Sequence, residues 1–179
     1  MSESPSLRRP RFFSGKLVTP EDLELQQQYF REKLKRHNRS LHGFGIVSGL
    51  KVTVNSGQIV VEPGLALDCE GNELAIETAQ SIVPPANVDW HTAFVSVCFV
   101  EEGAGTIPTA GAEGASNITA TIIESFRLAV AQENSNRGHK HLRARWLACE
   151  QPHALTIAKL KQSSQGWRVD RGYRPPTVK

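Results

Sequence analysis

The chain has 179 residues, of which 39% are hydrophobic and 22% are charged, and its formal net charge is +3. This length predicts one domain, or one domain with an appendage, whose core removes about two thirds of the unfolded surface from water. The longest apolar run, residues 93–100, is far below the roughly 18 residues of a membrane span, so we expect no such span. No apolar stretch follows the first arginines, which predicts that no signal peptide is present. The three cysteines stand in apolar surroundings and predict free thiols in a reducing, cytoplasmic compartment.

The charge is distributed unevenly along the chain. Residues 1–51 contain ten Lys and Arg against five Asp and Glu, whereas residues 52–179 contain eleven against thirteen. A basic head could bind nucleic acid, but no aromatic platform or groove-reading motif accompanies this charge. The pattern favours an acidic protein partner and no nucleic acid.

Residues 1–18 are expected to form an extended docking arm. The segment is polar and is interrupted by Pro5 and Pro10, and it then carries the adjacent pair Phe12 and Phe13. Two neighbouring phenylalanines either fold back on the body or insert into a neighbouring subunit. Because Phe and Arg often anchor interfaces, Arg11, Phe12 and Phe13 are candidate partner-binding residues.

Residues 19–41 are expected to be a basic amphipathic segment, with a helix from Pro20 to about Asn38. Thr19 can cap the helix, Pro20 suits its first position, and the next two residues are acidic. A narrow and mostly apolar stripe recurs at steps of three and four residues. Its members are Leu23, Gln27, Phe30, Leu34, His37 and Leu41. Arg31 and Lys35 lie outside this stripe and are further candidate partner-binding residues.

The stretch HNRSLHGFGIVSGLKV, residues 37–52, is interpreted as a hinge between helix and sheet. Asn38 and Gly43 can both end a helix. Gly45 and Gly49 either let the helix lie against the first strands or mark a strand bulge. His42 has no nearby nucleophile or acid at a useful spacing, so we expect it to bond backbone carbonyls. Besides Thr19 and Pro20, the candidate structural residues are therefore His42, Gly43, Gly45 and Gly49.

Residues 42–179 are expected to form a β domain of short antiparallel strands, arranged as a sandwich or a barrel-like fold. A small-residue loop is predicted at residues 103–116, and residues 142–149 favour a short helix although they fit a strand too. The predicted strands are 46–54, 58–62, 65–69, 73–77, 81–83, 92–101, 118–131, 154–161 and 167–170. The fold class is thus mainly β with one long N-terminal helix.

Motifs for chemistry are weak throughout the sequence. His139, His141, Cys149 and His153 lie close together but lack the paired spacing of zinc ligands. Three acids, at residues 68, 70 and 73, cluster around a predicted turn, where acids commonly serve solubility. No nucleophile elbow and no phosphate-binding loop is present. The sequence therefore predicts no enzyme, no metal and no cofactor, and favours an interaction module.

Two sequence blocks, RPRFFSGKLVTPEDLELQQQYFREKLKRHNRSLHGFGIVSGLKV and PGLALDCEGNEL, resemble small proteins of phage-tail-like contractile injection systems. They are similar also to the first modules of phage baseplate and tail-fibre proteins, as is the late element LTIAKLK…WRVDRGYRP. The matching residues in the first block are Phe12, Phe13, Gly15, Leu17, Asp22, Gln28, Tyr29, His42, Gly43, Gly45, Val47, Gly49 and Leu50.

The resemblance implies a structural subunit at a baseplate or its periphery, present in several copies and assembled in the cytoplasm. Its partners would be baseplate, tube or sheath subunits, and it would act by contact. Two alternatives stay open. A surface- or carbohydrate-binding module would expose aromatic side chains, for which Trp90, Trp146 and Trp167 are the candidates. A hydrolase or metal-dependent enzyme would need converging acids and histidines.

Overall fold

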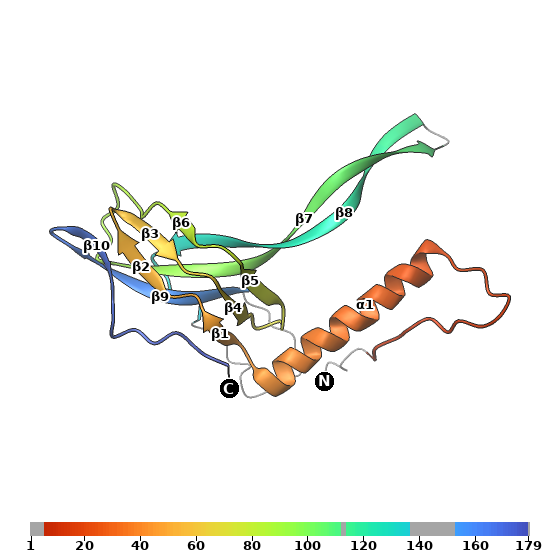
Figure 1. The fold of residues 1–179 in the computed structure, drawn as a ribbon, viewed down its shortest axis with the longest axis horizontal. Coiled ribbons are helices and arrows are strands. Elements are labelled where there is room, and N and C mark those ends of the chain that lie inside the picture. Colours follow the sequence, from red (N-terminus) through yellow and green to blue (C-terminus); the bar gives the residue numbers. More distant parts are fainter. Residues whose placement is uncertain (1–5, 112–113, 137–152, 179) are drawn as a thin grey trace.

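The computed structural model describes residues 6–111, 114–136 and 153–178. In this part of the chain, one helix and three antiparallel sheets account for the regular structure. Figure 1 shows the helix α1 projecting from the β body at its lower edge, and the outer half of the β7–β8 hairpin projecting to the same side. The prediction of a mainly antiparallel β fold with one N-terminal helix is confirmed.

The helix α1 runs Pro20–His37, as predicted to within a residue, and continues into a π-helical turn, Asn38–His42, that the sequence did not reveal. Thr19 Oγ1 accepts a hydrogen bond from the Asp22 backbone N–H, and the Asp22 carboxylate accepts one from the Thr19 N–H. This reciprocal cap satisfies donors that the first helical turn leaves without partners. Lys16 Nζ lies 2.7 Å from Asp22 Oδ1 and lowers the pKa of that carboxyl.

Two small sheets form one side of the body. The first has the order β1 (Gly45–Gly49), β4 (Gly64–Leu67), β5 (Glu73–Ile76). The second has the order β2 (Val52–Asn55), β3 (Gln58–Val61), β6 (Gln80–Ile82). The β2–β3 turn has positive φ at Ser56 and Gly57, as a two-residue hairpin loop requires, which confirms the predicted turn.

The prediction of one strand over residues 46–54 is wrong. The chain breaks at Leu50, which is buried and has a positive φ of 55°, so that β1 and β2 enter different sheets. There is no room for a side chain at Gly49, because the backbone of Pro63 and Gly64 passes directly over it. Gly45 is likewise covered by the backbone of Pro176. At these two glycines, other backbone segments of the β body make the close approach, and the helix does not. A bulge lies between Ile46 and Ser48.

The third sheet has the order β10 (Gly166–Val169), β9 (Ala154–Ser163), β7 (Thr92–Gly111), β8 (Gly114–Ala131). The predicted loop over residues 103–116 is wrong for every described residue in it, because β7 and β8 pair in register out to Gly111 and Gly114. Residues 103–111 contain many small side chains, but they form a strand because residues 114–122 pair with them. The predicted helix at residues 142–149 lies outside the described residues.

The core lies where the three sheets meet. Its fully buried side chains include Leu50, Ile59, Leu74, Val95 and Leu160. The alternation of β3 and β5 places every second residue in this cluster, as their sequences predict. No residue of α1 is buried, so the helix adds nothing to the core.

We expect Thr19→Ala to raise hydrogen exchange in the first turn of α1 about fivefold, because losing a cap costs about 1 kcal/mol. Since α1 stands off the body, exchange in the β strands should not change. Mass-spectrometric exchange on the wild-type and variant chains measures both effects. Ser14→Ala makes a comparable change in the arm and serves as the control. Equal exchange in Thr19→Ala and wild type would show that the cap does not hold this helix.

Candidate functional site

The arm and α1 form the most unusual surface of the molecule, which we call the projection (residues 6–42). Four apolar members of the predicted stripe, Leu23, Phe30, Leu34 and Leu41, are each more than half exposed. Phe12 and Phe13 are 48% and 64% exposed. Isolated helices of this length are marginally stable in water, and most helices in proteins are stabilised by packing of their apolar face. An exposed apolar stripe on a projecting helix therefore indicates a candidate protein-binding surface.

The arm returns along α1 and does not extend freely. The Arg9 guanidinium lies 5.8 Å from the centre of the Tyr29 ring, and Lys16 Nζ lies 5.3 Å from the centre of the Phe12 ring. The first of these cation–π contacts joins the arm to the helix, where the Tyr29 ring also packs edge to face against Phe30 of the stripe, and the second lies within the arm. The arm therefore folds back on its own helix, while both phenylalanine rings keep about half of their surface in water.

The candidate partner-binding residues do not come together in one cluster. Arg11, Phe12 and Phe13 lie on the exposed arm. Arg31 Nη1 instead donates to Glu101 Oε1 of β7 at 3.2 Å, within the same chain. Lys35 is half-buried, and its backbone lies against Gly71.

A socket for the helix lies on the β4–β5 turn, and sequence reasoning missed it. Asn38 is buried and donates from Nδ2 to the Gly71 carbonyl at 2.9 Å, and Arg39 donates to the Glu70 carbonyl. A side chain at Gly71 would collide with the Lys35 carbonyl, so glycine allows the close approach. The sequence motif DCEGNEL predicts a turn, but it contains no sign that a helix rests on that turn.

Asp68 holds the socket in shape. Its carboxylate is buried and accepts hydrogen bonds from the backbone N–H groups of Glu70 and Asn72, each at 2.9 Å, and from Asn72 Nδ2 at 2.7 Å. Every bond lies within the turn. Asp68 is thus a structural acid, and it does not converge with Glu70 and Glu73 on a reaction centre.

One Cys–His–carboxylate arrangement occurs in the described residues. His153 Nε2 lies 2.8 Å from Glu70 Oε1, and its Nδ1 lies 3.1 Å from Cys69 Sγ. Nucleophilic enzymes use this order of groups. Cys69 is however only 6% exposed and is itself part of the turn that carries the helix socket. The contacts tie His153 to that turn.

Metal ligation finds no support in the described part of the chain, where no group of three or more His, Cys, Asp or Glu could hold an ion. Of the four candidate ligands, only His153 falls within it; His139, His141 and Cys149 lie outside. His37 and His42 pack their rings edge to face, with centroids 5.4 Å apart. Among the described residues, no backbone carbonyl accepts a hydrogen bond from His42, and its ring packs against His37.

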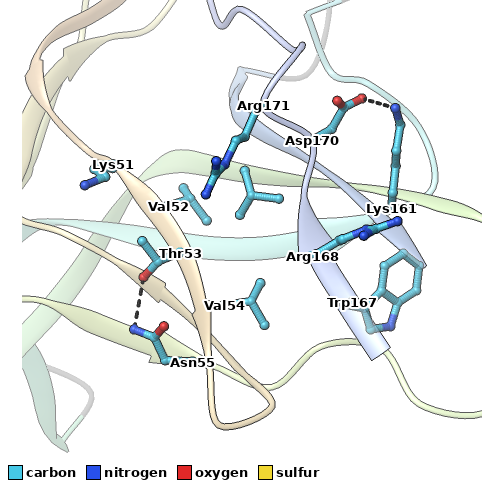
Figure 2. A pocket seen from close by; sticks show the side chains of 11 residues that line it. Lys51, Val52, Thr53, Val54, Asn55, Lys161, Trp167, Arg168, Asp170 and Arg171 are labelled. Carbon is cyan, nitrogen blue, oxygen red and sulfur yellow. Dashed lines mark hydrogen bonds and ion pairs between the residues drawn. The ribbon is translucent and has the colours of Figure 1, made fainter. Parts of the chain in front are cut away.

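A basic groove of about 840 Å³ lies between the edge strands β2 and β10. Figure 2 shows Lys51, Arg168 and Arg171 around it, with Val52 and Val54 on its floor. Its one acid, Asp170, bonds Lys161 at 3.0 Å, which lowers the pKa of Asp170. A groove without a free carboxylate or a histidine fits binding of an anionic group and offers no acid–base pair.

The two tryptophans among the described residues, Trp90 and Trp167, do not form an exposed sugar platform. Trp90 and Trp167 are partly buried and pack against the core, and the Trp167 indole N–H donates to the Pro85 carbonyl at 3.2 Å. Trp146 lies outside the described residues. No helix among the described residues has the length and hydropathy to cross a membrane.

No family model and no curated protein sequence matches the chain. Three solved structures share its fold over 96% of its length. They are TssK (TM-score 0.55, 10% identity), the TssK–TssF–TssG baseplate subcomplex of the type VI secretion system (0.53, 13%) and the baseplate complex of that system (0.57, 12%). The chain spans 42%, 62% and 42% of the matched chains, respectively. At such low identity the likeness establishes the fold alone: this chain is built like part of a type VI secretion baseplate protein.

Proposed function

We propose that this chain is a structural subunit of a phage-tail-like contractile injection apparatus, located at the baseplate or its periphery. It acts by docking to other subunits and carries out no bond-making chemistry. The observation that carries this proposal is the projection, a capped helix with an uncovered apolar stripe and an arm that exposes two phenylalanines. The shared fold with baseplate proteins and the sequence blocks noted above support it.

The physical argument concerns the helix. Exposed large apolar residues are ordinary when scattered singly, whereas here Leu23, Phe30 and Leu34 lie along one line of α1, which has no buried residue, and Leu41 follows in the π-helical turn. Reciprocal capping and the socket at Gly71 stabilise and orient α1 without covering that line. A helix held in place in this way, with its apolar side toward solvent, is suited to a helix-in-groove or helix-on-sheet contact.

The arm supplies the second contact. Phe12 and Phe13 are rigid, large and about half exposed, which are the properties of interface anchors. Arg11 adds charge beside them, and the basic second half of α1, with Arg31 and Lys35, favours an acidic surface on the partner. The partners would be baseplate, tube or sheath subunits, with several copies of the chain in each particle assembled in the cytoplasm.

The experiment is co-purification of the tagged chain with the products of the neighbouring genes. We expect it to migrate in a density gradient with sheath, tube or baseplate subunits. A chain that stays at the top of the gradient with none of them, yet is retained on a glycan array, would favour the surface- or carbohydrate-binding alternative. Hydrolysis of a substrate panel by the purified chain would favour the enzyme alternative.

A further inference from the structure

Within the described part of the chain, a second element also projects from the body. Among the described residues, β9 pairs with β7 only as far as Cys98, so the hairpin beyond it is a two-stranded ribbon (residues 99–111 and 114–126), whose base, Phe99 and Phe126, packs against the core. Two-stranded ribbons are marginally stable in water without a packing partner. Figure 1 shows this ribbon projecting past the body, as α1 does. We propose that the ribbon of one copy packs on the apolar stripe of α1 in a second copy. This inference rests on the docking role proposed above and names the partner for the stripe.

The ribbon carries exposed apolar side chains suited to the contact. Ile107, Ile122 and Ile123 are each at least half exposed. The regular alternation of the strands is interrupted between them, because Gly105 has a positive φ of 67° and the Thr119 side chain fills the space beside Gly103. The register pairs Glu101 with Glu124 near the body. The result is an apolar strip with acids at its base.

Charge favours a second copy as the occupant. Residues 99–126 contain four Glu and no Lys or Arg, whereas residues 31–39 contain five Lys and Arg and one Glu. Within one chain, these two elements already meet through the ion pair from Arg31 to Glu101. The apolar strip of the ribbon and the apolar stripe of the helix are thus each bordered by charge of opposite sign, which sets orientation and suppresses like-to-like pairing.

The dimensions also agree. From Leu23 to Leu41 the stripe is about 27 Å long at 1.5 Å per residue. From Glu101 to Gly111 the ribbon is about 33 Å long at 3.3 Å per residue. Because each copy offers one helix and one ribbon, the contact is heterologous, and repeated contacts close a ring or extend a filament.

Two variants remove one surface each. Phe30→Glu with Leu34→Glu disables the stripe and keeps good helix formers. Ile107→Thr with Ile122→Thr removes two exposed apolar side chains of the ribbon and keeps β-branched residues. We expect the wild type to be multimeric by light scattering and each double variant to have the 19.7 kDa mass of a monomer. Val83→Ser changes an exposed apolar side chain of the β body, and Gln28→Glu changes another face of α1; both controls should assemble as wild type does.

Mixing the two double variants gives the decisive result. The intact ribbon of the first and the intact stripe of the second should form a 1:1 dimer that grows no further. A ribbon variant as multimeric as the wild type would overturn the inference in favour of a helix–helix contact. A wild type that stays monomeric at every concentration would also overturn it. If such a monomer still migrated with the particle in the gradient, the result would support the proposed function and contradict only the contact between two copies.

Discussion

Removing residues 1–13 is expected to abolish incorporation of the chain into the particle while leaving the β body folded. The truncation ends before the Thr19 cap and takes away Phe12 and Phe13, but it leaves the socket and the core intact. Buried aromatic anchors often contribute 2 kcal/mol or more each to an interface. Losing two of them should weaken binding roughly a thousandfold.

The full-length double variant Phe12→Ser with Phe13→Ser separates the rings from the rest of the arm, including the Arg9 contact with Tyr29. It should also fail to incorporate. Val83→Ser is the matched control, because Val83 is an exposed apolar residue of the β body, 74% accessible. Incorporation is measured as the tagged chain recovered per particle, and folding as the free energy of unfolding. Normal recovery of the double variant would remove the docking role of the two rings.

Replacing Asp68 by alanine is expected to lower the free energy of unfolding by about 3–5 kcal/mol. The change leaves two backbone N–H groups and the Asn72 amide without the acceptor that they share in a buried turn. Because that turn receives Asn38 and Arg39, α1 should also lose its fixed direction.

Denaturant titration measures the first effect, and hydrogen exchange at residues 38–42 measures the second. Glu73→Ala removes an exposed carboxylate close to the same turn and should change stability by less than about 0.5 kcal/mol. If Asp68→Ala unfolded at the same denaturant concentration as wild type, the turn would not depend on that carboxylate.

Local signals in the sequence predicted most of the fold. The Thr19–Pro20 start defined the helix, and the turn at Asn55–Gly57 defined a hairpin, because each depends on residues within a few positions of one another. The wrong predictions depended on distant partners. Residues 103–111 form a strand because residues 114–122 pair with them, and no local composition reveals that pairing.

The residues of the candidate site could be predicted from the sequence, but the contacts that arrange them in space could not. The apolar stripe and the phenylalanine pair are visible in the sequence, but periodicity cannot tell a helix face that packs on its own body from one that is left exposed. The socket could not be found either, since Asn38 and Gly71 lie 33 residues apart and meet through a side chain and a carbonyl. That long-range contact fixes the end of α1 on the β4–β5 turn.

The most direct measurement is hydroxyl-radical footprinting of Phe12 and Phe13 in the purified chain and in the assembled particle. Both rings are about half exposed in the chain itself. We predict that both become strongly protected in the particle, while Val83 is labelled equally in the two samples. Equal labelling of the two rings in chain and particle would contradict the claim that this protein works by fitting its arm to other subunits.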